Sequence, residues 1–169
     1  NTKWLVGGVT GWARSLIENH DHPIDFSTRW AVCEDLIYSY PLHRSHRLLV
    51  AKDARVNHNQ TYSEMSLKRG IYYGLSQVIM RFYFVSINED LSKPLFVWMT
   101  LGQLLGYMLM GVRGDRRSLG FFLGGIKGLI LCLLTVFDSK SPKNLAEGLF
   151  NKFCFFYCSW QYHLLKLKW

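Results

Sequence analysis

The chain has 169 residues, 49% of them apolar, and carries a formal net charge of +8. This length suits one modest soluble domain, but the charge is unevenly spread: residues 1–93 hold 11 Lys and Arg against 9 Asp and Glu, and residues 94–169 hold 9 against 3. The basic residues of the second part flank long apolar runs instead of lining a polar face. This pattern favours anionic lipid and argues against nucleic-acid binding.

The first residues are typical of the interior of a longer protein. Asn1 stands where an initiator Met is expected, and residues 4–8 predict a strand that enters a turn, without the charged and apolar regions of a signal peptide. The four cysteines have no Cys-x-x-Cys spacing, and Cys132 lies within an apolar run. We therefore expect reduced thiols and neither a disulfide framework nor a zinc site.

Residues 1–63 alternate short strand-like and helix-like segments. The predicted strands cover residues 3–6, 47–51 and 54–58, and the predicted helices cover residues 11–19 and 31–40. Gly7 and Gly8 permit a tight turn after the first strand, Thr10 can cap the first helix, and Pro41 should end the second. The pattern predicts an α/β domain that is too small to be a complete nucleotide-binding domain.

Residues 64–93 predict one long helix, because apolar side chains recur at steps of three and four residues from Leu67 to Phe82. Several aromatic residues and Arg81 accompany this stripe. The combination is typical of an amphipathic helix at a membrane interface, and equally of an ordinary domain helix with aromatic core residues.

Residues 94–137 predict a hairpin of two membrane helices. Residues 94–112 contain no charge, residues 119–137 contain only Lys127, and a bilayer core needs about 20 apolar residues as helix. Lys127 at the bilayer centre would cost about 2.5–3.5 kcal/mol unless its side chain reaches the interface or a polar cavity. Small-xxx-small spacing at Gly120, Gly124 and Gly128 permits close helix contact. The alternative is a buried hairpin of a soluble protein.

The tail, residues 138–169, is basic and aromatic and is typical of an interfacial segment. The loop before the second apolar run holds three arginines at positions 113, 116 and 117, which the positive-inside tendency places in the cytoplasm. If residues 1–93 are cytoplasmic too, a first segment that spans once breaks this rule. The number of spans and their orientation therefore stay open.

Three features stand in a suggestive order: Gly7-Gly8, then Glu34-Asp35 within Trp30-Ala-Val-Cys-Glu-Asp, then Ala54-Arg-Val-Asn-His58. Two runs of membrane length follow them. In this order and spacing, the chain resembles the C-terminal half of the catalytic domain of the family 2 inverting glycosyltransferases over roughly residues 3–137. The resemblance implies a partial GT-A (Rossmann-like) α/β domain, followed by an α-helical membrane hairpin and an interfacial tail.

The resemblance also implies a function. A nucleotide-sugar donor would give its sugar to a lipid-linked or polysaccharide acceptor at the cytoplasmic face of the cell membrane, expected to be a bacterial inner membrane. Such transfer needs a carboxylate that takes the acceptor proton, and this role falls to Asp35, with Glu34 as its orienting neighbour. It also needs charge neutralisation at the leaving diphosphate, which implies a divalent cation, Mg²⁺ or Mn²⁺.

Further contacts follow from the resemblance. His58 is the metal-ligand candidate, together with an Asp-x-Asp motif that these 169 residues lack. The substrate-binding candidates are Gly7, Gly8, Trp12 and Trp30, although core packing explains Trp12 equally well. Because the nucleotide-binding half is missing, we expect the chain alone to be inactive.

The sequence also departs from the family pattern, and plainer explanations exist. Ile37 and Pro41 stand where many members have an acid and an arginine. Adjacent acids at a helix start are favoured by the helix dipole alone. The run His43-Arg44-Ser-His46-Arg47 suits either an acceptor phosphate or a solvated loop. The alternative function is a small membrane-anchored interaction module without catalysis.

Overall fold

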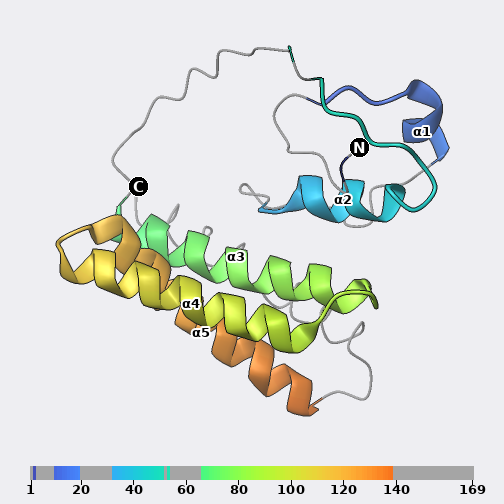
Figure 1. The fold of residues 1–169 in the computed structure, drawn as a ribbon. Coiled ribbons are helices and arrows are strands. Elements are labelled where there is room, and N and C mark those ends of the chain that lie inside the picture. The colour runs from blue at the N-terminus through green and yellow to red at the C-terminus, as the bar shows by residue number, and fades with distance from the viewer. Residues whose placement is uncertain (1, 3–9, 20–31, 52, 54–65, 139–169) are drawn as a thin grey trace, which may run out of the picture. The chain divides into compact units, whose positions relative to one another are not determined.

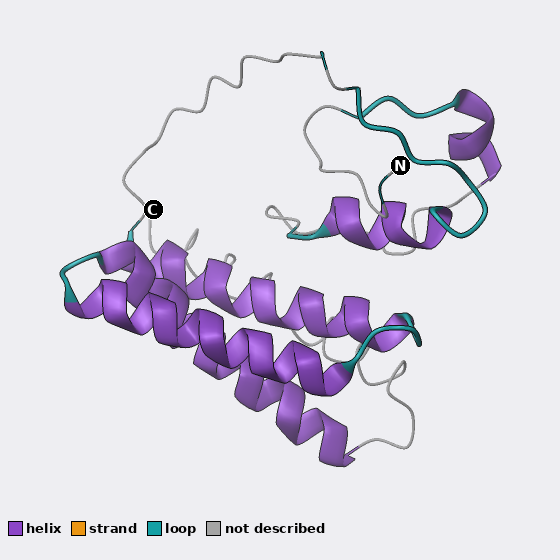
Figure 2. Cartoon of the chain, viewed as in Figure 1, coloured by secondary structure: helices purple, strands orange, loops and turns teal. Residues whose placement is uncertain are grey.

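The computed structural model describes residues 2, 10–19, 32–51, 53 and 66–138. These residues form five α-helices (Figures 1 and 2): α1 (Arg14–Asn19), α2 (Glu34–Leu42), α3 (Leu67–Ile87), α4 (Lys93–Val112) and α5 (Arg116–Asp138). The chain divides into two compact units, Asn1–Ser63 and Glu64–Trp169. We call them unit 1 and unit 2 and describe each by itself.

The predicted α/β fold class is wrong for the described residues, which contain helices but no strand and no sheet (Figure 2). Residues 47–51, predicted as a strand, form a loop, and one backbone hydrogen bond between this loop and another described segment joins Thr2 N to Leu48 O at 3.3 Å. One such bond does not make the repeated ladder of a sheet. The described part of unit 1 is therefore no Rossmann-like GT-A domain, and the strands predicted over residues 3–6 and 54–58 lie outside it.

The two helices of unit 1 differ from their predicted bounds. Helix α1 begins at Arg14 and not at residue 11. Helix α2 continues through Pro41 to Leu42. A proline removes one N–H donor and crowds the turn before it, which is tolerable here because only one residue of the helix follows. The amides of His43 and Arg44 then bond to the carbonyls of Tyr40 and Pro41, both at 3.3 Å, in a tighter final turn.

Polar side chains set the starts of the helices in unit 2. The Ser66 hydroxyl accepts from Arg69 N and begins α3, and the Ser92 hydroxyl accepts from Leu95 N and begins α4, both at 3.3 Å. Asp115 does the same for α5, since its carboxylate accepts from Arg117 N at 3.0 Å and from the Ser118 hydroxyl at 2.6 Å. This cap explains why α5 begins three residues before its apolar run.

Glycines bring α3 and α5 together along their length. A Cβ atom added at Gly120 would lie 2.8 Å from Leu67 O, and Cβ atoms added at Gly74 and Gly124 would overlap the backbones of Phe121 and Ile71. The predicted small-xxx-small spacing of α5 is thus confirmed as a packing surface. The matching small residues on α3, Gly70 and Gly74, were not predicted from the sequence. Contact of this kind lets two backbones approach and gain dispersion energy without help from water.

Helix α4 packs on α5 by larger side chains. Leu104 lies directly against Gly125, and Gly111 leaves room for the backbone of Leu119. The shared core of unit 2 contains seven buried residues from the three helices: Val78, Ile79, Phe82, Phe96, Leu104, Leu129 and Cys132. Phe82 and Phe96 join α3 to α4 within this core, with ring centroids 5.9 Å apart.

Among the described residues, two helices are long and apolar enough to cross a membrane: Lys93–Val112 and Arg116–Leu134. This confirms two helices of membrane length where they were predicted. The apolar residues of α4 point largely outward, with Trp98 74% and Met99 65% exposed, and only 17% of its apolar stretch is buried. A core helix of a soluble protein would be mostly buried, so this exposure favours contact with lipid.

We expect Gly124→Ala to destabilise unit 2 by about 1–3 kcal/mol, because the added methyl group overlaps the α3 backbone and forces the helices apart. The measurement is reversible unfolding in mixed micelles, followed by circular dichroism. Gly106→Ala is the matched control, since nothing lies within 4 Å of a Cβ atom there. Its stability should stay equal or rise by up to about 1 kcal/mol, and equal loss in both variants would contradict the packing described.

The Asp115 cap predicts a pH dependence at the start of α5. The hydrogen bond from Ser118 holds the pKa of Asp115 below its ordinary value of 3.8. A carboxyl with a depressed folded pKa stabilises the fold fully above its unfolded value and loses this contribution as pH falls through the folded value. We therefore expect the start of α5 to weaken below about pH 4.

The pKa of Asp115 can be measured directly from the carboxyl carbon shift by NMR. We expect a value below 3.8 in the wild type and a higher one in Ser118→Ala. The same pKa in both proteins would show that the Ser118 hydroxyl does not act on this carboxylate.

Candidate functional site

The acidic pair opens α2, which begins at Glu34 and not at residue 31 as predicted. Glu34 and Asp35 occupy the first helical turn, where the backbone dipole favours negative charge. Glu34 is exposed and Asp35 is partly buried. The two carboxylates therefore stand at a helix start from which Glu34 at least reaches solvent.

The residue before the pair, Cys33, has an unusual backbone. Its φ of 65° and ψ of 17° lie in the left-handed region, which costs an L-residue about 1–2 kcal/mol. The helix nonetheless begins here, with Ile37 N bonded to Cys33 O at 2.9 Å. Local strain of this kind gathers at sites where a neighbouring group needs a fixed direction, and it marks the entrance to α2 as a candidate site.

Trp12 lies beside the acidic turn through Tyr38. The two rings meet edge to face, with centroids 5.0 Å apart and planes at 88°. Tyr38 follows Asp35 by three residues and Glu34 by four, so all three share one side of the helix. Both aromatic residues are partly exposed. The packing explanation for Trp12 thus has a named partner, and the pair also offers apolar surface next to the carboxylates.

The opposite face of α2 is anchored. Ile37 and Ser39 have no exposed surface, and Tyr40 is 5% exposed. Ile37 holds the position for which the sequence resemblance leads us to expect an acid. A carboxylate at a fully buried position would lose its hydration without a charged partner, so the departure at Ile37 agrees with the burial.

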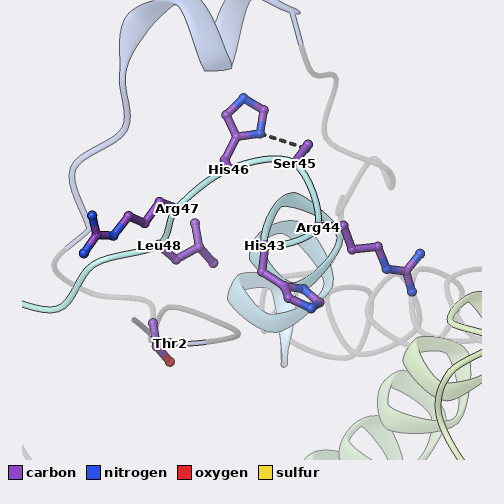
Figure 3. Close-up of a pocket in the computed structure, with 7 residues that line it drawn as sticks. All are labelled: Thr2, His43, Arg44, Ser45, His46, Arg47 and Leu48. Atoms are coloured by element: carbon purple, nitrogen blue, oxygen red, sulfur yellow. Dashed lines mark hydrogen bonds between the residues drawn. The ribbon is translucent and has the colours of Figure 1, made fainter.

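A basic turn, residues 43–47, follows α2. With Thr2 and Leu48, it lines a hollow of about 600 Å³ (Figure 3). His43 Nδ1 contacts the carbonyl of Tyr40, and the Ser45 hydroxyl lies 2.8 Å from His46 Nδ1. In Figure 3, the side chains of Arg44 and Arg47 extend to opposite sides of the turn. The sequence showed the basic run but not the hollow.

Unit 2 holds a polar chain that the sequence analysis missed. The Arg81 guanidinium on α3 donates to the Gln103 side-chain oxygen on α4, and Gln103 Nε2 lies 2.9 Å from the Tyr107 hydroxyl. The Tyr107 ring in turn packs edge to face on Phe121 of α5, with centroids 5.1 Å apart. The sequence held two signals of this polar chain. Arg81 is a charge within a mostly apolar helix, and Gln103 is the single glutamine of the uncharged run of residues 94–112.

Four predicted site residues lie outside the described residues: Gly7, Gly8, Trp30 and His58. The structure therefore joins Glu34 and Asp35 with Trp12 and does not test the rest. Within the described ranges, no group of three or more His, Cys, Asp or Glu side chains is placed to hold a metal ion.

Comparison with known proteins gives no match to a family model, to a curated protein or to a solved structure.

Proposed function

We propose that the chain acts in membrane-associated glycosyl transfer, with Asp35 as the general base. The supporting observation is the acidic pair at the start of α2 beside the partly exposed Trp12–Tyr38 pair. The order of sequence features around the pair and the two helices of membrane length add to it. The donor is a nucleotide sugar, and the acceptor is lipid-linked or a polysaccharide.

Each candidate site residue that the structure describes has a defined task in this proposal. The Asp35 carboxylate takes the proton from the acceptor hydroxyl while that oxygen bonds to the anomeric carbon and the nucleotide diphosphate leaves with the electron pair. Glu34 orients the acceptor or the base. The Trp12 ring offers an apolar face to a sugar ring. The described residues do not fit a site for the divalent cation that the resemblance implies, and no step here runs through one.

The membrane helices would keep the reaction close to a lipid-linked acceptor. The exposed apolar side chains of α4 suit the hydrocarbon of a bilayer. We place the chain at the cell membrane, in a bacterium at the inner membrane, with unit 1 on the cytoplasmic side.

A second candidate function is a membrane-anchored interaction module without catalysis. It is favoured by the all-helical character of the described residues, since the described part of unit 1 shows no sheet of the kind on which family 2 glycosyltransferases build their donor site. The two candidates make different predictions for Asp35.

In membranes that carry the full-length protein, Asp35→Asn should lower the rate of sugar transfer by about 10²–10⁴-fold, because the amide cannot accept the proton. Binding of the nucleotide-sugar donor should change little. The matched control is Glu18→Gln, an exposed carboxylate of α1 that pairs with Arg14 at 2.7 Å, and it should keep normal turnover. Normal turnover in Asp35→Asn would exclude the role assigned to Asp35, and no transfer by the wild type would favour the interaction module.

The lipid contact of α4 is tested by Leu105→Arg. Leu105 is 54% exposed, and an arginine at mid-helix should oppose insertion by about 2.5–3.5 kcal/mol. The chain should then leave the membrane fraction on alkaline carbonate extraction, whereas the wild type stays. Leu49→Arg, at a 60% exposed leucine of unit 1, is the control and should behave as the wild type. A wild-type chain that is itself extracted would contradict membrane insertion.

A further inference from the structure

Helix α3 has the length but not the composition of a membrane span. Its 21 residues, Leu67–Ile87, rise about 31 Å, which is close to the thickness of a hydrocarbon core. It is not one of the two helices that are apolar enough to cross, because Arg81 and several other polar residues lower its hydropathy. Whether α3 enters the bilayer therefore depends on how it packs against α4 and α5.

Contacts with α5 define the depth of the first half of α3. A Cβ atom added at Gly70 would lie 3.1 Å from the carbonyl oxygen of Arg117, in the first turn of α5. Further along both helices, a Cβ atom added at Gly128 would lie 3.0 Å from the Cβ atom of Val78. The two helices therefore run parallel (Figure 1), and α3 begins at the level at which α5 begins.

Contacts with α4 define the depth of the second half of α3. The rings of Phe82 and Phe96 have centroids 5.9 Å apart, and Phe96 lies in the first turn of α4. At the far end of α4, Gly111 lies against the backbone of Leu119, in the first turn of α5. Helix α3 therefore lies beside α4 from the level of one end of α4 to the level of the other, and is present at every depth that α4 reaches.

The burial of α3 accounts for its lower hydropathy. Every residue from 70 to 88 is buried or half-buried, whereas the outer face of α4 is exposed. The Ser76 hydroxyl donates to the Tyr72 carbonyl at 2.9 Å, and the Arg81 guanidinium donates to Gln103. A span that is shielded in this way can carry polar side chains, because they form their hydrogen bonds within the protein.

Lys127 is the least favourable residue of α5 for insertion, because it is exposed midway along the helix. The stretch Arg116–Leu134 has the composition of a span even with this lysine included. Leu123 and Ile130, four residues before it and three after it, are exposed and apolar. The face around the lysine therefore suits hydrocarbon.

We propose that α3 crosses the membrane as a third span, with its start on the same side as the loop that holds Arg113. Such a crossing requires the insertion of α4 that the proposed function includes, and it is independent of sugar transfer. The additional crossing removes the conflict with the positive-inside tendency, because it brings the residues before α3 and the arginine loop to the same side, the cytoplasmic one. Glu89 and Asp90, between α3 and α4, then lie on the opposite side.

The test is cysteine accessibility of the 169-residue chain in spheroplasts of a bacterial host, with a thiol reagent that does not cross membranes. Cys33, Cys154 and Cys158 are replaced by serine, and the buried Cys132 is kept. Single cysteines are then placed at exposed positions at the start of α3, between α3 and α4, and between α4 and α5: Lys68→Cys, Glu89→Cys and Arg113→Cys.

We expect Lys68→Cys and Arg113→Cys to be labelled about tenfold less in intact spheroplasts than after permeabilisation, because the bilayer separates both from the reagent. Glu89→Cys should be labelled equally in the two conditions. Asp53→Cys, at an exposed position before α3, is a second reporter and should behave as Lys68→Cys does. The variant with Cys132 alone is the control and should stay unlabelled.

Two other patterns overturn the proposal and can be told apart. If Lys68→Cys behaves as Glu89→Cys does and Arg113→Cys differs from both, α4 crosses and α3 does not. If all three positions are labelled alike, α4 does not cross either, and the membrane insertion in the proposed function is contradicted as well. The role of Asp35 is measured separately, by the transfer assay.

Discussion

The close approach of α3 and α5 is the contact on which unit 2 depends. Gly70 of α3 meets Gly120 of α5, Gly74 lies against the backbone of Phe121, and Gly124 lies against the backbone of Ile71, so backbone packs on backbone where side chains would normally intervene. In a bilayer, burial from water gives no driving force between helices, and such dispersion contact takes its place. Helix α4 joins through Leu104 in the space that Gly125 leaves. The contact between α3 and α5 does not use the outer face of α4. That face is apolar and exposed.

Unit 1 is organised by the polarity of one short helix. Helix α2 has carboxylates in its first turn and a histidine at its C-cap, and both agree with the direction of the backbone dipole. The buried Ile37 and Ser39 fix the helix from one face, while Trp12 packs on Tyr38 at the other. Two chemically opposite surfaces, acidic and basic, are thereby held a fixed distance apart.

The sequence allowed the three long helices to be predicted, because runs without charge and apolar steps of three and four residues report directly on helices. The small residues of α5 were also predicted as a contact surface. Gly70 and Gly74 of α3 were not, because a pair of glycines in a sequence does not indicate which other helix it faces. The strand predicted at residues 47–51 was wrong: aliphatic residues form a strand only where a partner strand satisfies their backbone, and the described residues provide none beside this segment. Helix α2 was predicted, although it begins at Glu34 and not at residue 31. The hollow at residues 43–48 arises from a turn geometry that composition does not encode.

The hydrogen bond between Arg81 and Gln103 has a consequence for how unit 2 enters a bilayer. Gln103 is at the middle of α4, so where α4 crosses the membrane this bond brings a guanidinium of α3 to the depth of the hydrocarbon centre. A charge at that depth is tolerated when polar groups of a neighbouring helix surround it. Where α4 crosses the membrane, α3 would therefore lie inserted beside it at least as far as Arg81, whose guanidinium is already hydrogen-bonded to Gln103.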